Sequence, residues 1–124
     1  MELSSSRSFT VNASARLNFG TKIISGAGST FTLASNGTID IGHQEGIVAS
    51  GNSGNIQTAT RTLNAGGHYI YSGTSEQVTG SGLPTANITG TLTIDNPTSV
   101  SLSSSHTLSN SSIPLYLNQG LLIL

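Results

Sequence analysis

The spacing of apolar residues limits what this chain can fold into more than any other feature. An aliphatic residue alternates with threonine or serine in Leu92-Thr93-Ile94 and in Val100-Ser101-Leu102, and these two segments are eight residues apart. The same eight-residue step separates Phe31, Ile39 and Ile47. Alternation with a period of two is typical of β-strands that bury one face. The pattern therefore predicts a series of short strands along the chain.

Residues that favour turns separate the predicted strands. Glycine and asparagine tolerate the positive φ angles that sharp corners need, and proline is tolerated where no ladder hydrogen bond is lost. The segment Gly37–Ile41 resembles Gly90–Ile94, which indicates one structural unit that occurs twice. The predicted corners include Gly26-Ala27-Gly28, Ser35-Asn36-Gly37, Ser50–Asn55, Ala65-Gly66-Gly67 and Asn96-Pro97.

Three short strands at eight-residue steps would form one coil of about 24 residues, which gives about five coils in the chain. We therefore predict an all-β fold, a right-handed parallel β-helix (β-solenoid). It would occupy residues 1–124 as a single segment of a longer repeat protein. The alternative is an antiparallel β-sandwich, because short strands at regular intervals are typical of that fold as well.

The composition excludes several classes of protein. Charged residues make up 7% of the chain, against about 25% in ordinary domains. The polar surface comes instead from 21 Ser, 16 Thr and 10 Asn, which are unfavourable in helix interiors. Four basic residues and a net charge of −1 argue against a nucleic-acid partner. The N-terminal residues lack the apolar segment of a signal peptide, and no apolar run approaches the ~20 residues of a membrane span.

Four residues are candidates for ligand binding. Tyr69 and Tyr71 lie on the same side of one predicted strand, where exposed rings would offer a stacking platform for sugars and buried rings would widen the core. We expect Asp40 and Asp95 to occupy equivalent strand positions of the two similar units, roughly 10 Å apart along one face. An inverting glycosidase could use such a pair. We favour the interpretation that both are solvated surface residues.

No other pattern indicates catalysis or a cofactor. The three histidines, His43, His68 and His106, lack the spacing of metal ligands. There is no G-x-S-x-G nucleophile elbow and no P-loop. We therefore predict no catalytic residue, no metal and no cofactor.

The C-terminal half of the chain resembles a known group of proteins. The segments that carry the resemblance are Tyr69–Pro84, Leu92–Asn96 and Val100–Leu102. They are similar to β-solenoid repeat regions of large secreted and cell-surface Bacteroidetes proteins, which are adhesin-like cargo of the type IX secretion system. The resemblance implies an extracellular or cell-surface location.

We expect a non-enzymatic structural or adhesive segment whose partners are glycans or neighbouring copies of itself, without membrane insertion. Self-association would use the apolar end Leu121–Leu124. One alternative is a β-helix protein that binds or degrades polysaccharides. A second is a solenoid that binds ice or another surface, for which regular threonine ranks would be the sign. Five threonines hint at such ranks, although their spacing is irregular: Thr30, Thr32, Thr38, Thr91 and Thr93.

Overall fold

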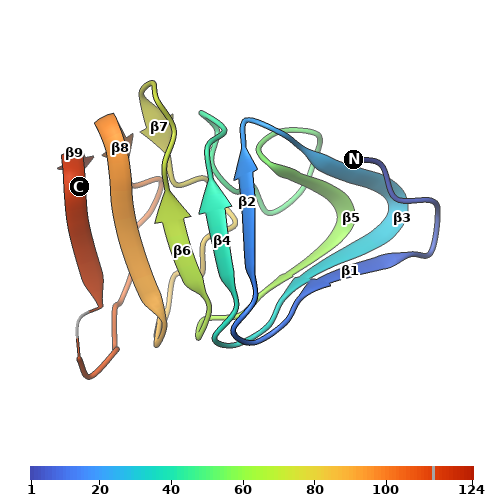
Figure 1. The fold of residues 1–124 in the computed structure, drawn as a ribbon, viewed down its shortest axis with the longest axis horizontal. Coiled ribbons are helices and arrows are strands. Elements are labelled where there is room, and N and C mark those ends of the chain that lie inside the picture. The colour runs from blue at the N-terminus through green and yellow to red at the C-terminus, as the bar shows by residue number, and fades with distance from the viewer. Residues whose placement is uncertain (113) are drawn as a thin grey trace.

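The computed structural model describes residues 1–112 and 114–124, in which nine β-strands and no helix occur (Figure 1). None of these residues belongs to a helix that could span a membrane. The strands are β1 (Ser8–Val11), β2 (Arg16–Gly20), β3 (Ile24–Leu33), β4 (Thr38–Ile41), β5 (Ile56–Leu63), β6 (His68–Tyr71), β7 (Gln77–Val78), β8 (Thr91–Ser101) and β9 (Leu115–Ile123).

The strands form two sheets in which every pairing is parallel. One sheet has three strands in the order β1-β3-β5. The other has six strands, in which β2, β4, β6 and β8 follow one another and both β7 and β9 pair with β8. From β1 to β6 the chain alternates between the two sheets, so consecutive strands never pair with each other. Figure 1 shows the six-stranded sheet running from β2 to β9, with β1, β3 and β5 at the N-terminal side.

This architecture corrects the predicted fold. The parallel β-helix of about five regular coils is wrong, because the structure is a pair of parallel sheets of three and six strands. The separation of paired residues is not constant: Phe9 pairs with Phe31, 22 residues later, but Phe31 pairs with Arg61, 30 residues later. The antiparallel β-sandwich is also wrong, since no pairing is antiparallel in the described chain.

The predicted short strands at a fixed eight-residue step also differ from the strands observed. Strand lengths vary from 2 to 11 residues. The two alternating segments that suggested separate strands are joined in β8, which runs through the expected corner at Pro97. The expected corner at Gly26–Gly28 lies inside β3. A period of two records only which side chains share a face, so it determines neither where a strand ends nor which strand it pairs with.

The apolar core consists of side chains from the inner faces of both sheets. In the larger sheet Ile39, Tyr69 and Leu92 are in register and buried. In the smaller sheet Phe9 stacks on Phe31, with ring centroids 5.9 Å apart and planes 7° apart. Burial of each large apolar side chain stabilises the fold by about 1.5–3 kcal/mol. The register therefore aligns apolar residues along the interior and leaves the alternate positions outside.

Buried amide side chains satisfy the backbone where the chain leaves the sheets. The Nδ2 atom of Asn55 donates to the carbonyls of Gly20 and Lys22, at 2.9 and 2.7 Å. Gln77 Nε2 donates in the same way to the carbonyls of Ile41 and His43, both at 2.9 Å. No buried side-chain nitrogen or oxygen in the described residues lacks a partner. These bonds fix connections that have no regular ladder of their own.

Candidate binding surface

A regular array of hydroxyl groups covers the outer face of the three-stranded sheet. The inward positions of β1 and β3 hold Phe9, Phe31, Val11 and Leu33, so the positions between them point away from the core. Six outward positions carry serine or threonine, and we call them the hydroxyl face: Ser8, Thr10, Thr30, Thr32, Thr60 and Thr62.

Strand register arranges these six side chains in two straight ranks. Ser8, Thr30 and Thr60 are paired across the sheet and form the first rank. Thr10, Thr32 and Thr62 form the second. Neighbouring strands lie about 4.8 Å apart, and alternate residues along a strand about 6.6–6.8 Å apart. The result is a two-dimensional lattice of hydroxyl groups.

The hydroxyl face is available to a ligand. Each of its six residues is exposed or partly exposed. Within the described residues, none of the six hydroxyls makes a hydrogen bond to the rest of the protein, while the backbones that carry them are held in parallel ladders. Threonine has few χ1 rotamers because it is branched at Cβ. The array therefore presents free donors and acceptors on a rigid support.

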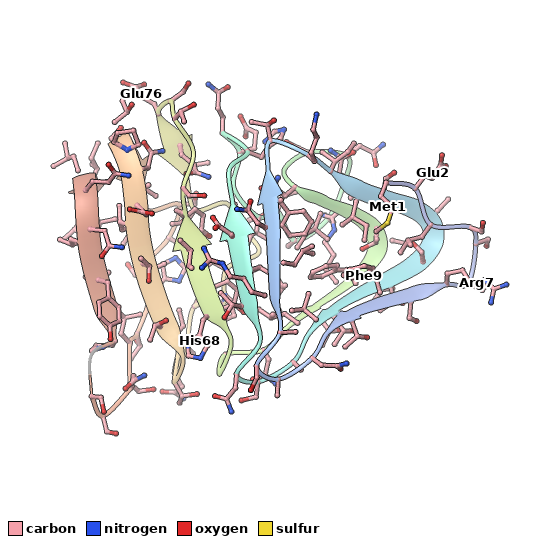
Figure 2. All side chains as sticks on the ribbon, viewed as in Figure 1. Met1, Glu2, Arg7, Phe9, His68 and Glu76 are labelled. Atoms are coloured by element: carbon pink, nitrogen blue, oxygen red, sulfur yellow. The ribbon has the colours of Figure 1, made fainter. Side chains whose placement is uncertain are left out.

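Charged side chains close to this face are directed elsewhere. Arg61 lies between Thr60 and Thr62 in sequence, but its side chain occupies the opposite side of β5. Its Nη1 donates to the carbonyl of Val48 at 2.6 Å, and its Nη2 donates to the carbonyl of Gly51. Desolvation by burial lowers the pKa of this guanidinium below its ordinary value. Arg7 precedes β1 and projects away from the N-terminal end of the domain (Figure 2).

Asp40 is a buried structural carboxylate. It is 3% exposed. Its Oδ2 accepts a 2.7 Å bond from Arg16 Nη2, which forms a salt bridge, and its Oδ1 accepts a bond from the Ser72 hydroxyl. Arg16 and Ser72 lie 24 and 32 residues away in sequence. The sequence offered no local sign of either partner, and together they occupy both oxygen atoms.

Asp95 lies apart from Asp40. The register places Asp40 beside Ile70 and Ile70 beside Thr93, so Thr93 rather than Asp95 shares the position of Asp40. Asp95 accepts a 3.2 Å bond at Oδ1 from Gln119 of β9. The two carboxylates therefore contact different neighbours, and the structure does not bring them together as a pair.

Tyr69 and Tyr71 belong to the core. Both are completely buried. Their hydroxyls donate to the carbonyls of Asn64 and Thr79, at 2.7 and 2.8 Å respectively. Burial raises the pKa of both phenols, and the neighbouring Tyr69 adds to the rise at Tyr71. Neither ring offers a surface on which a ligand could stack.

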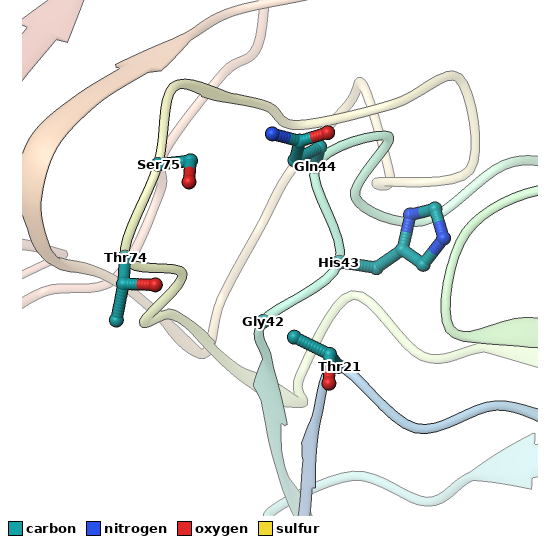
Figure 3. Close-up of a pocket in the computed structure, with 6 residues that line it drawn as sticks. All are labelled: Thr21, Gly42, His43, Gln44, Thr74 and Ser75. Carbon is teal, nitrogen blue, oxygen red and sulfur yellow. The ribbon is translucent and has the colours of Figure 1, made fainter.

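The hollows on the surface differ in the groups that line them. Glu45 and Glu76 line one hollow together. Another lies beyond the end of β4 and is lined by Thr21, Gly42, His43, Gln44, Thr74 and Ser75 (Figure 3). The His43 ring points away from Thr74 and Ser75 in this view, and its Nδ1 accepts a 3.1 Å bond from the backbone of Glu45. Besides this imidazole, the side chains that line the hollow carry hydroxyl and amide groups, and none of them is a carboxylate.

The other two histidines also have separate partners. His68 Nδ1 lies 2.9 Å from Thr91 Oγ1, and His106 Nδ1 lies 2.9 Å from the carbonyl of Pro84. His68 and Glu76 lie at opposite ends of the strands (Figure 2). Among the described residues, no three His, Asp or Glu side chains are grouped so that they could hold a metal ion.

The sequence pattern predicts only part of the hydroxyl face. It indicates Thr30 and Thr32, but not the residues beside them in β1 and β5. The other threonines in the predicted ranks, Thr38, Thr91 and Thr93, lie in the larger sheet, where His68 and Ile70 interrupt the ranks. The missed signal was a shared triplet, present as Ser8-Phe9-Thr10, Thr30-Phe31-Thr32 and Thr60-Arg61-Thr62.

Comparison of the chain with protein-family models, with curated proteins and with solved structures finds no match. The resemblance to secreted Bacteroidetes repeat proteins therefore stays a prediction.

Proposed function

We propose that this protein is a non-enzymatic structural and adhesive domain that binds an extended polar surface through its hydroxyl face. The proposal rests on the strand register. It places Ser8, Thr30 and Thr60 in one rank, and Thr10, Thr32 and Thr62 in a second rank beside it. A lattice of hydroxyl groups can form many weak hydrogen bonds to a repeating surface without any reactive group. Each bond contributes only about 0.5–1.5 kcal/mol, so affinity depends on engaging several at once.

The placement of Asp40 and Asp95 supports a non-enzymatic role. General acid–base catalysis needs an acid or base within hydrogen-bond reach of the substrate. Asp40 is buried and engaged by Arg16 and Ser72. Asp95 contacts Gln119. Neither arrangement leaves two carboxylates facing one substrate.

An extracellular or cell-surface setting fits this proposal. The scarcity of charge makes binding through the hydroxyl face only weakly dependent on salt, because screening acts on charges. Tethered copies would raise the effective concentration of each binding face. A cell-surface array would therefore bind much more strongly than one domain.

The test is adsorption of the purified chain to insoluble polar solids, namely crystalline cellulose, crystalline chitin and ice. We expect retention on at least one solid, with little change between low and high salt. Thr32→Lys, which places a charge at the centre of the hydroxyl face, should abolish retention. The matched control Thr93→Lys makes the same change on the other sheet and should retain binding.

Two results would overturn the proposal. One is the absence of retention on every solid. The other is the release of soluble sugars from a polysaccharide in a reaction that Asp40→Asn or Asp95→Asn abolishes, since that result would identify an enzyme.

A further inference from the structure

We infer that the solid surface recognised by the hydroxyl face is ice. This inference rests on the proposed function and adds the identity of its ligand. The relevant property of the face is that it repeats in two directions at once, across the strands and along them. A ligand that engages all six hydroxyls must repeat in the same two directions.

The lattice spacing is the first argument. Backbone pairing sets a repeat of about 4.8 Å across the strands, and alternate residues set a repeat of about 6.6–6.8 Å along them. The oxygen atoms on a prism face of hexagonal ice repeat in two perpendicular directions at spacings close to these. Each hydroxyl of Thr10, Thr32 and Thr62 can therefore occupy an equivalent position on the ice surface.

The chemistry of the side chains is the second argument. Threonine presents a methyl group beside its hydroxyl, and five of the six residues are threonine. The methyl groups order neighbouring water, while the hydroxyls can replace water molecules in the lattice. A charged group would instead hold its own hydration shell. None of the six residues in the two ranks has a charged side chain. The side chain of Arg61 is held by hydrogen bonds to the carbonyls of Val48 and Gly51.

Rigidity is the third argument. Hydroxyl groups bind a crystal lattice well only if they are already ordered before binding, because ordering side chains on binding costs free energy. The ladders of β1, β3 and β5 fix the backbone. Stacking of Phe9 on Phe31 supports the sheet from inside.

The same face is poorly suited to soluble sugars. Sugar-binding sites commonly place aromatic rings against the faces of the sugar. Here Tyr69 and Tyr71 are buried in the core of the other sheet, and Phe9 and Phe31 stack on the inner side of this one. None of the six outward positions is aromatic.

The experiment measures partition of the full chain into ice. A single ice crystal is grown slowly from a dilute solution of the protein, and the fraction incorporated is compared with that of a protein of similar size that has no hydroxyl array. Parallel samples are tested for inhibition of ice recrystallisation and for retention on crystalline cellulose and chitin. Circular dichroism and thermal melting confirm that each variant folds.

We expect the wild type to be enriched in ice and to slow recrystallisation. Thr32→Val should reduce the affinity for ice about threefold to tenfold, as expected for the loss of one net hydrogen bond. Thr32→Lys should abolish enrichment, and Thr93→Lys should leave it unchanged. Should Thr32→Lys fail to fold, Thr10→Lys on the exposed strand β1 makes the same test.

Other outcomes separate this inference from the proposed function. Exclusion from ice with retention on cellulose or chitin that Thr32→Lys abolishes would overturn the ice inference and leave the adhesive proposal standing. Absence of retention on all solids would overturn both. Ice enrichment that survives both Thr32→Lys and Thr10→Lys would overturn the assignment to this face.

Discussion

The hydroxyl of Tyr71 donates a 2.8 Å hydrogen bond to the carbonyl of Thr79 in the interior of the protein. The same carbonyl also accepts the backbone N–H of Ile47 at 3.1 Å. The bond therefore joins a strand of the larger sheet to the irregular segment that follows β7. Burial of the phenol raises its pKa well above the ordinary value of 10.0, and burial raises the pKa of Tyr69 as well.

These raised pKa values predict alkaline unfolding. Below pH 10 both tyrosines are protonated in the folded and the unfolded chain, so their titration does not affect stability. Above pH 10 the unfolded chain loses protons that the folded chain retains, and the free energy of unfolding falls. The loss is at most about 1.4 kcal/mol per pH unit for each tyrosine. Urea unfolding measured from pH 7 to pH 11.5 checks the prediction.

Tyr71→Phe isolates one of the two contributions. At pH 7 we expect this substitution to lower the free energy of unfolding by about 1 kcal/mol, the net value of one hydrogen bond. The Thr79 carbonyl still accepts the N–H of Ile47. Above pH 10 it should halve the decline in stability. An unchanged decline in this variant would contradict the assignment of the effect to the buried phenols.

Local alternation predicted which residues are buried better than it predicted the fold. Ile39, Leu92 and Ile94 are core residues as their spacing indicated. The regular coil failed because the connections have unequal lengths: three residues separate β2 from β3, whereas fourteen separate β4 from β5. Nothing in the local pattern around Phe31 indicates that its partner is Arg61.

The contacts of the candidate residues could not be predicted either, because their partners are distant in sequence. The pairing of Asp40 with Arg16 depends on register across β2 and β4, which the sequence does not display. Tyr69 and Tyr71 have the alternation of a strand, but alternation alone does not say which face is buried. The hydroxyl face could be recognised only once β1, β3 and β5 were known to be neighbours.

Arg16 and Asp40 form a salt bridge, but substituting one should lower the free energy of unfolding more than substituting the other. The Asp40 side chain is 4% exposed and that of Arg16 is 59% exposed. Arg16→Ala leaves a buried carboxylate with only the Ser72 hydroxyl, which should cost about 2 kcal/mol. Asp40→Asn leaves a guanidinium that water can reach, so its cost should be about 1 kcal/mol or less. Equal costs in chemical denaturation would contradict this explanation.

Two glycines provide a matched test of backbone packing between successive segments. Gly80 and Gly51 have similar φ angles, +78° and +84°. A Cβ atom on Gly80 would lie 2.1 Å from the carbonyl oxygen of Ile47, whereas one on Gly51 would meet nothing within 4 Å. Gly51→Ala should therefore cost only the strain of a positive φ, about 1–2 kcal/mol.

Gly80→Ala should lower the free energy of unfolding by more than about 4 kcal/mol. This variant has the strain of a positive φ and, in addition, a clash with the backbone that no side-chain movement relieves. Thermal melting of both variants measures the difference. A similar melting temperature for the two would show that the segments around Ile47 and Gly80 can separate at little cost.

The exposed edge of β9 should promote self-association. β9 pairs with β8 on one side, and no other described strand pairs with it. Most of the exposed large apolar side chains of the described chain lie on or next to this strand: Tyr116, Leu117, Leu121, Ile123 and Leu124. An apolar edge strand without a guarding charge favours pairing with another chain. We therefore propose that copies associate through this end, and expect sedimentation velocity to show oligomers that increase with concentration.

Leu117→Lys and Leu121→Lys together should shift the protein to a monomer, because a lysine at an edge strand opposes pairing and the substitution removes apolar surface. The control Thr60→Lys with Thr62→Lys adds the same two charges to the other sheet and should leave association unchanged. A wild type that remains monomeric at high concentration would contradict the proposal. So would a double variant that associates as strongly as the wild type, since that result would assign the contact to another surface.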